Sequence, residues 1–223
     1  LFLVSEDRYI ITEISNNKQV QQYIKERVNE FKLKISPDMR GHIKHLLIKI
    51  GHPVEDIAGY VSGAHFDMEL KSITSEGREF HPRDYQQQAA DAFYAGGSNK
   101  GGSGVIVLPC GAGKTVVGMI LMEKIKSETL ILTTNITALR QWKQELLDKT
   151  NIPEDCIGEY SGEVKEIKPV TISTYQILTH RNDRTQNFPH FDLFKKKDWG
   201  FIIYDEVHLL PAPVFRITAE IQA

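Results

Sequence analysis

A short apolar run followed by a glycine turn and a Lys-Thr pair is the feature that most constrains this chain. Val105–Leu108 are consecutive apolar residues, and Pro109–Gly113 continue them as a turn with two glycines. Lys114 and Thr115 then open a second apolar run that fits a helix. Strand, glycine loop and helix start, in that order, are the context of a phosphate-binding loop. The sequence therefore predicts a nucleotide site here, with a glycine turn that binds nothing as the alternative.

The residue types in this loop suit phosphate chemistry. Gly111 and Gly113 allow a sharp turn and let backbone N–H groups approach phosphate oxygens. Lys114 supplies a positive charge for the β- and γ-phosphates, and Thr115 supplies a hydroxyl for Mg²⁺. Leu108 stands where the pattern G-x-x-x-x-G-K-[ST] has glycine, so only the second half of the pattern is met. The predicted nucleotide-binding loop consists of Pro109, Cys110, Gly111, Ala112, Gly113, Lys114 and Thr115.

Composition sets wider limits. The 223 residues are 41% hydrophobic and 25% charged with a net charge of −2, as in a soluble globular protein with one large domain or one large and one small domain. Cys110 and Cys156 have no metal-ligand or redox spacing, which favours a reduced cytosolic protein. No apolar run approaches the length of a membrane span. Because the chain begins without Met and stops inside a helical pattern, we expect it to be a fragment of a longer protein.

The first 72 residues predict a small mixed α/β domain. Residues 1–14 fit a β-hairpin, and Asn16 or Asn17 fits the cap of a following helix. Hydrophobic periodicity then predicts a strand, a helix and a further strand over residues 31–35, 36–50 and 66–70. The polar residues 73–82 fit a linker.

In the remainder of the chain, short apolar strands alternate with helices. The strands are predicted over residues 129–133, 170–174 and 201–204. Thr137 fits the cap of a helix that carries Leu139, Trp142 and Leu146 on one face. Such alternation is typical of a parallel α/β sheet, whose ligands gather at the carboxyl ends of the strands. All the candidate motifs lie at those ends.

The predicted strand over 201–204 leads directly into Asp205 and Glu206. After a phosphate loop, such a pair suits nucleotide hydrolysis: Asp205 holds Mg²⁺ through its hydration shell, and Glu206 orients and polarises the attacking water. A solvated acidic turn is the alternative for this strand end taken alone. Together with Lys114, the two carboxylates predict a nucleoside triphosphatase.

Two four-residue segments carry a family resemblance. Asp205-Glu206-Val207-His208 resembles the DExH box of superfamily 2 helicases and translocases, and Arg83-Asp84-Tyr85-Gln86 is similar to the motif that precedes their phosphate loop. The resemblance implies that Gln86 reads adenine, that Arg83 packs against the base, and that His208 couples the nucleotide site to the DNA-bound state. For the segment Arg83-Asp84-Tyr85-Gln86, the alternative is an ordinary amphipathic helix with three glutamines.

A closer resemblance is carried by several segments together. Leu108–Thr115, Trp142 with Lys143, Ile172–Tyr175 and Trp199-Gly200 before the DExH box are similar to the XPB family of DNA repair and transcription translocases, over about residues 33 to 223. The resemblance implies four segments: the end of an N-terminal accessory region, a damage-recognition-like domain, a linker and a RecA-like first helicase lobe, at residues 1–30, 31–72, 73–82 and 83–223. The second lobe is then absent.

The same resemblance implies an ATP-dependent 3′-to-5′ DNA helicase or double-strand DNA translocase acting in repair of the nucleotide-excision type. ATP and Mg²⁺ are the implied cofactors. Lys114, Asp205, Glu206 and His208 are the implied catalytic residues, with Thr115 and Asp205 at the metal. The implied contacts with DNA phosphates are Thr134, Asn135, Thr174 and Tyr175, for each of which helix capping or strand-end packing is the alternative.

The implied partners are duplex or forked DNA, a nuclease or other repair protein, and the C-terminal helicase lobe, with no membrane. A bacterial or archaeal protein is expected, cytoplasmic and nucleoid-associated; a eukaryotic one would be nuclear. Because the absent lobe supplies arginines to the transition state, we expect this chain to bind nucleotide weakly and to hydrolyse little ATP. Two alternatives remain open: another superfamily 2 motor, on RNA or of the restriction type, and a non-catalytic DNA- or protein-docking module.

Overall fold

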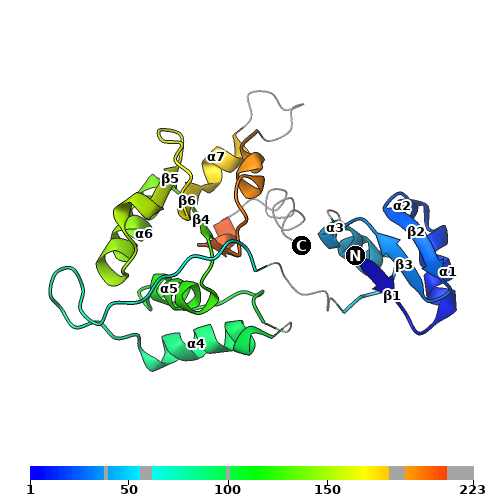
Figure 1. Cartoon of the computed structure of the whole chain (residues 1–223), viewed down its shortest axis with the longest axis horizontal. Helices are drawn as coiled ribbons and strands as arrows, with labels where there is room; N and C mark the ends of the chain where they lie inside the picture. Colours follow the sequence, from blue (N-terminus) through cyan, green and yellow to red (C-terminus); the bar gives the residue numbers. More distant parts are fainter. Residues whose placement is uncertain (38–39, 56–61, 99–100, 181–188, 210–223) are drawn as a thin grey trace. The chain divides into compact units, whose positions relative to one another are not determined.

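The computed structural model describes residues 1–37, 40–55, 62–98, 101–180 and 189–209. These residues form two compact units, one within residues 1–55 and the other within residues 62–209. Figure 1 traces the first unit in blue and the second from cyan to red. The predicted class, a parallel α/β sheet preceded by a small mixed α/β unit, is confirmed.

The first unit contains a three-stranded antiparallel sheet and three helices. The sheet has the order β1-β3-β2 and consists of β1 (Phe2–Val4), β3 (Lys32–Ile35) and β2 (Ile24–Asn29). The helices are α1 (Arg8–Asn16), α2 (Lys18–Gln21) and α3 (Arg40–Lys49). The core consists of aliphatic side chains from the sheet and the helices: Leu3, Ile11, Ile14, Val20, Leu33, Ile35, Ile43, Leu46 and Leu47. The strand and helix predicted over 31–35 and 36–50 are confirmed over residues 32–35 and 40–49, while residues 38 and 39 of the predicted helix start lie outside the described residues.

The hairpin predicted for residues 1–14 is wrong in its second half. Residues 9–14 belong to α1, because the carboxylate of Asp7 accepts a hydrogen bond from the backbone N–H of Tyr9 at 2.7 Å and caps the helix. Ile11 and Ile14 lie three positions apart on one helix face, and both are buried. The β-branched residues favour a strand in the sequence, but the cap and the buried face determine a helix.

The next predicted helix is shorter than expected. Asn17 caps it as predicted, with its side-chain oxygen 2.9 Å from the N–H of Gln19, but the helix ends at Gln21 and the chain enters β2. β3 then pairs with β1 on one side and β2 on the other. The boundary predicted between residues 30 and 31 therefore falls inside a single sheet.

Residues 62–82 belong to the second unit. The sequence predicts a strand of the first domain over residues 66–70, and the structure corrects this: Met68 is buried in the core of the second unit. The backbone N–H of Phe66 donates to the carbonyl of Lys126 at 3.0 Å. Residues 62–82, here called the strap, thus pack along the second unit instead of joining the first sheet.

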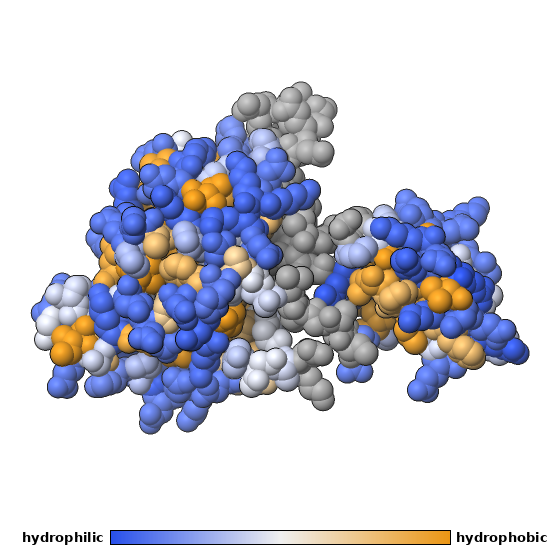
Figure 2. Space-filling model, viewed as in Figure 1, coloured by the Kyte–Doolittle hydropathy of each residue, from blue (hydrophilic) through white to orange (hydrophobic). Residues whose placement is uncertain are grey.

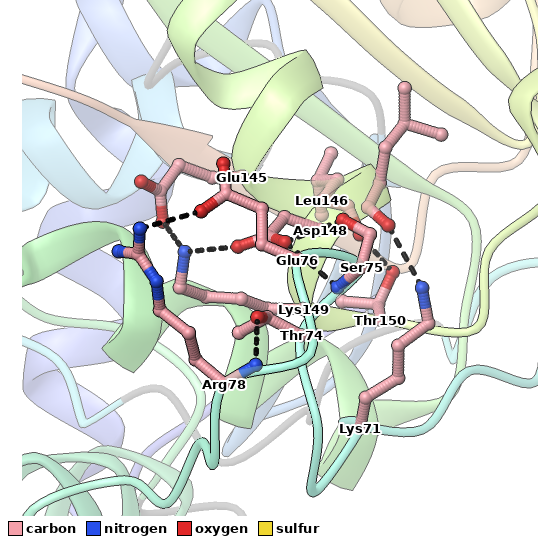
Figure 3. A network of polar contacts seen from close by, with 11 residues as sticks. Lys71, Thr74, Ser75, Glu76, Arg78, Glu145, Leu146, Asp148, Lys149 and Thr150 are labelled. Carbon is pink, nitrogen blue, oxygen red and sulfur yellow. Dashed lines mark hydrogen bonds and ion pairs between the residues drawn. The ribbon is translucent and has the colours of Figure 1, made fainter.

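Polar contacts hold the strap on helix α6 (Ile136–Lys149). Figure 3 shows Ser75 and Lys71 reaching the C-terminal end of this helix. The Ser75 hydroxyl donates to the Asp148 carboxylate at 2.5 Å, and Lys71 Nζ donates to the carbonyl of Leu147 at 2.9 Å. The expected linker over 73–82 is therefore packed along the unit.

The second unit is built on a parallel sheet. Its strands have the order β5-β6-β4-β7 and are β5 (Ile157–Tyr160), β6 (Val170–Thr174), β4 (Thr129–Thr133) and β7 (Phe201–Tyr204). Three of them have the predicted bounds, and β5 was not predicted. All residues of β4 and β6 are buried, as expected for central parallel strands. Hydrophilic residues cover most of the visible surface of this unit (Figure 2).

Helices cover the sheet. They are α4 (Asp84–Tyr94), α5 (Lys114–Ile125), α6 and α7 (Tyr175–Thr179). 3₁₀ helices occur at Ala95–Gly97, Glu154–Cys156, Pro189–Lys195 and Val207–Leu209. Helix α5 lies beside α4 (Figure 1) and also packs against β7, and residues 116–122 within it are all buried. A helix apolar on all sides is expected in such a central position.

The face predicted for α6 is confirmed, but its cap is a different residue. Leu139, Trp142 and Leu146 are buried. The side-chain oxygen of Asn135 accepts a hydrogen bond from the N–H of Ala138 at 2.9 Å, which makes Asn135 the cap in place of Thr137. Asn135 suits this position because its amide oxygen satisfies a free N–H of the first turn.

The buried strand predicted over residues 105–108 is wrong. These residues lie outside the four-stranded sheet, and the side chains of Val105 and Val107 are 71% and 86% exposed. Ile106 and Leu108 are half-buried against the core. The segment therefore has the alternation of a strand, but no strand of the described chain pairs with it.

Candidate active site

The phosphate loop has the backbone conformation that its glycines predict. Gly111 and Gly113 have φ values of +77° and +75°, and α5 begins at Lys114. A Cβ atom on Gly113 would lie 2.5 Å from Nε2 of Gln86, whereas a Cβ on Gly111 would meet nothing within 4 Å. The positive φ favours glycine at both positions, and at Gly113 the nearby Gln86 side chain also leaves no room for a Cβ atom.

Gln86 holds this loop. Its side chain is buried, and Nε2 donates to the carbonyl of Ala112 at 2.8 Å. Its Oε1 accepts from the backbone N–H of Arg83 at 2.9 Å, which ties the amide to the start of α4. The Tyr85 hydroxyl also donates to the Ala112 carbonyl at 2.8 Å and accepts from Arg83 Nη1 at 3.0 Å. Tyr85 is a loop contact that sequence reasoning missed, and adenine recognition by Gln86 stays a prediction.

Lys114 and Glu206 form an ion pair across the site. The Glu206 carboxylate raises the pKa of Lys114, with smaller contributions from Cys110 and Asp205. In return, the ammonium group of Lys114 lowers the pKa of Glu206, although partial burial opposes this. Both side chains are about one-third exposed, so solvent screens the pair.

Glu206 has an unusual backbone. Its φ is +53°, in the left-handed region that residues with a Cβ seldom adopt. This turn directs the carboxylate to Lys114, while the exposed His208 lies with Nδ1 3.4 Å from Glu206 Oε2. Strained residues cluster at functional sites, so the strain at Glu206 is consistent with a catalytic position.

Two aromatic donors hold Asp205. Trp142 Nε1 donates to Asp205 Oδ2 at 2.9 Å, and the Tyr175 hydroxyl donates to the Asp205 carbonyl at 2.7 Å. Burial, reinforced by Asp205, raises the pKa of the Tyr175 hydroxyl, which therefore stays a donor at neutral pH. Neither contact was predicted from the sequence. The signal available was that a buried indole N–H or phenol O–H needs an acceptor.

The residues predicted to contact DNA lie at the carboxyl ends of β4 and β6. Thr134 is half-buried and Asn135 is exposed, and the Asn135 amide donates to the Thr134 hydroxyl at 3.1 Å. Thr174 and Tyr175 are buried. The capping alternative holds for Asn135, and the Tyr175 hydroxyl is used inside the protein, so any DNA contact at Tyr175 would use its backbone.

The donor set at this site suits Mg²⁺ held jointly with phosphates. Thr115 is half-buried at the start of α5, and Asp205 lies close enough to Lys114 to influence its pKa. The described residues contain no group of three or more His, Cys, Asp or Glu that could hold a metal unaided. Mg²⁺ commonly uses one or two carboxylates, water and substrate phosphates, so one carboxylate with a hydroxyl fits the ion.

Comparisons with known proteins agree with this geometry. The family described as "Type III restriction enzyme, res subunit" matches residues 79–222. The "DNA 3'-5' helicase XPB" of Mycobacterium tuberculosis is 52% identical over all of this chain and 38% of its own length. The protein of the same name from Kineococcus radiotolerans is 47% identical over the same shares. The crystal structure of the UvsW helicase from bacteriophage T4 matches 99% of this chain and 78% of its own, with a TM-score of 0.50 and 16% identity, which supports the fold alone.

These relatives are much longer than the chain, which spans 38% of the two bacterial proteins. The identity extends over both units, beyond the nucleotide loop and the DExH segment. The resemblance to XPB helicases inferred from the sequence is therefore confirmed. The chain belongs to the family described as type III restriction enzyme, res subunit.

Proposed function

We propose that this chain is the nucleotide-binding part of an ATP-dependent 3′-to-5′ DNA helicase or double-strand DNA translocase that acts in DNA repair. The observation that carries the proposal is the Lys114–Glu206 pair beside Asp205, at the carboxyl ends of parallel strands. The names and identities of the relatives supply the direction of travel and the nucleic acid.

In this proposal, nucleotide binding exchanges one partner of Lys114 for another. The ammonium group pairs with Glu206 in the structure. Phosphate oxygens arriving at the N-terminus of α5 compete for it, because the loop N–H groups and the helix dipole favour anions there. Glu206, once released, is free to orient a water molecule and accept its proton. The ion pair thus keeps the general base occupied until phosphate arrives.

Thr115 and Asp205 would hold Mg²⁺, which supplies charge neutralisation of the β- and γ-phosphate oxygens. Asp205 is suited to this role because the backbone on both sides of its Cα is bound: its N–H donates to the carbonyl of Leu132 at 2.9 Å, and its carbonyl accepts from Tyr175. A fixed carboxylate needs little rearrangement as the site fills.

The test is ATP hydrolysis by the full-length protein with and without duplex DNA. We expect DNA-stimulated turnover that Lys114→Ala lowers about 10- to 100-fold, since the variant loses a contact to a charged phosphate. The 223-residue chain should bind ATP weakly and turn over little, because arginines from a second lobe contribute about 10³–10⁵ in rate where measured. Fast DNA-stimulated turnover by the chain alone would contradict the half-site proposal.

We propose that duplex or forked DNA is tracked through the strand-end segments Thr134–Asn135 and Thr174–Tyr175. Equal stimulation of the full-length ATPase by RNA and by duplex DNA would instead favour a motor of the RNA type. The first unit would be a damage-recognition-like docking module; deleting residues 1–55 should weaken duplex binding, and unchanged binding would count against a DNA role. A nuclease or other repair protein is the proposed protein partner.

The proposed location is the cytoplasm, at the nucleoid, in line with the bacterial relatives. Within the part of the chain that the structure describes, no helix is long and apolar enough to cross a membrane.

A further inference from the structure

The indole of Trp142 is a buried donor aimed at the proposed magnesium ligand. The ring is 3% exposed, and Nε1 lies 2.9 Å from Asp205 Oδ2. In the described residues no other hydrogen bond or ion pair reaches this carboxylate. Because an indole can only donate, it fixes which carboxylate oxygen faces α6 and leaves Oδ1 for other ligands. Trp142 therefore selects the orientation of the Asp205 side chain.

The position of the indole is itself fixed by packing. Gly118 of α5 faces the ring so closely that a Cβ there would lie 2.8 Å from Cη2 of Trp142 and 3.3 Å from Cδ1 of Ile203. The ring thus lies in a slot between α5, which begins at Lys114, and β7, which ends beside Asp205. A side chain in a close-packed slot has one rotamer available, so it can act as a rigid support.

Tyr175 reaches the same residue from the end of another strand. It is the first residue of α7, directly after β6, and β4 lies between β6 and β7 in the sheet. Its hydroxyl bonds the Asp205 carbonyl at 2.7 Å, and the Asp205 N–H bonds Leu132 at the end of β4. The backbone of Asp205 is therefore bound to the ends of two other strands, to β4 directly and to β6 through Tyr175.

The two donors come from the helices that follow the strand ends proposed to track DNA. Thr134 and Asn135 precede α6, which carries Trp142, and Thr174 precedes α7, which begins with Tyr175. A shift of either helix on the DNA side must move a donor that holds Asp205. Rigid elements linked by hydrogen bonds are the physical requirement for such coupling, and variants must then demonstrate it.

We propose that Trp142 and Tyr175 are positioning residues that hold Asp205 for Mg²⁺ and link that carboxylate to the DNA-side helices α6 and α7. The proposal deepens the proposed function and rests on it. Trp142 sets the orientation of the carboxylate, and Tyr175 sets the backbone that carries it. Outer partners of metal ligands commonly contribute about 10- to 100-fold to metal affinity.

The first experiment measures ATP binding to the 223-residue chain during a Mg²⁺ titration. Trp142→Phe keeps an aromatic ring in the Gly118 slot and removes only the N–H donor. We expect the half-saturating Mg²⁺ concentration to rise about 10-fold, while ATP affinity without Mg²⁺ stays at the wild-type value. The matched control is Trp199→Phe, because the Trp199 N–H donates to the Leu193 carbonyl at 3.0 Å and not to Asp205. If Trp142→Phe and Trp199→Phe had the same half-saturating Mg²⁺ concentration, the proposal would be overturned.

A second readout leaves the Trp142 contact intact. The chain has two tryptophans, so Trp199→Phe makes Trp142 the sole indole emitter. We expect its fluorescence to change as Mg²⁺ is added to the ATP-bound chain, because the acceptor of its N–H gains a metal. In Trp142→Phe, the emission of Trp199 should not respond. A sole Trp142 that is silent to Mg²⁺ contradicts a link to the metal site, even if the Phe variant folds poorly.

The coupling is tested in the full-length protein with Tyr175→Phe. We expect DNA stimulation of ATPase to fall about fivefold, the lower range of measured couplings between sites. Tyr160→Phe is the matched control, since its buried hydroxyl contacts His190 at 3.0 Å instead of Asp205. Equal stimulation in both variants overturns the Tyr175 link. Failure of the proposed function is distinct: wild type would then show no ATP binding that depends on Lys114.

Discussion

The two halves of the proposed nucleotide site are held in place by different means. The phosphate loop follows a segment outside the sheet, and hydrogen bonds from Gln86 and Tyr85 to the Ala112 carbonyl hold it. The acidic half follows β7, which is paired with β4 along its length, and aromatic donors hold it there. The loop half therefore depends on a few backbone angles and contacts, and the acidic half on the sheet. Substitutions should perturb the first more strongly than the second.

The largest effect is expected at Gly113. Alanine there would adopt a strained φ and would collide with Gln86, whose Nε2 lies 2.5 Å from the added Cβ. We expect Gly113→Ala to lower the free energy of unfolding by about 2–3 kcal/mol, from strain plus a lost buried hydrogen bond. Urea denaturation measures it.

Gly111→Ala is the matched control for this change. Its φ is nearly the same, but the added Cβ meets nothing within 4 Å. Strain alone predicts a loss of about 1–2 kcal/mol. Equal losses at both positions would show that Gln86 does not restrain the loop, and would remove the stated difference between the two halves.

The next effect tests Gln86 itself. Gln86→Glu replaces the donor to Ala112 with an acceptor at a buried position, so we expect about 2 kcal/mol less stability at neutral pH and weaker ATP binding. Gln88→Glu on the same helix carries the same charge change at an exposed position and should be nearly neutral. Calorimetric titration with ATP and thermal unfolding together separate the two. A stable Gln86→Glu chain with normal ATP affinity would contradict loop positioning.

The sequence predicts most of this site but not the way in which it is held. Lys114, Asp205 and Glu206 were predicted because glycine turns and acidic strand ends are local patterns. β4, β6 and β7 were predicted because buried parallel strands are short and β-branched. The contacts of Trp142 and Tyr175 with Asp205 join residues 63 and 30 positions apart, and no local pattern records them.

The errors have equally physical causes. Residues 105–108 are as apolar as a buried strand, yet no strand of the described chain pairs with them. The apolar composition of a segment does not indicate whether a neighbouring strand is available. Residues 9–14 are rich in β-branched side chains, yet Asp7 caps them as a helix. Residues 66–70 alternate like a strand but pack Met68 into the second unit. A local cap overrides strand propensity at residues 9–14, and tertiary packing does so at Met68.

In the acidic half, Glu206→Gln is expected to tighten ATP binding. The variant removes the negative partner that phosphate must displace from Lys114. A partly exposed ion pair contributes at most about 1 kcal/mol, which corresponds to about fivefold in affinity. Hydrolysis by the full-length protein should be lost, because the carboxylate that orients water is gone. Glu163→Gln, at an exposed surface pair with Arg140, should change neither quantity. Weaker ATP binding by Glu206→Gln would contradict the partner exchange.

The smallest effect is the pH dependence of the same ion pair. Lys114 lowers the pKa of the Glu206 carboxyl below its ordinary value of 4.5, so the pair stabilises the folded chain above that pH and the contribution is lost as pH falls through the lowered pKa. Glu206 raises the pKa of Lys114 above 10.5, so the complementary loss occurs only in strong alkali. Between these two pKa values the ion pair should add a constant amount to the free energy of unfolding, at most about 1 kcal/mol after solvent screening. Thermal unfolding of wild type and Glu206→Gln from acid to neutral pH should show two curves that converge at low pH. Parallel curves would mean that Lys114 and Glu206 are not paired in the absence of nucleotide, and that the acidic half is held by Trp142, Tyr175 and the sheet alone.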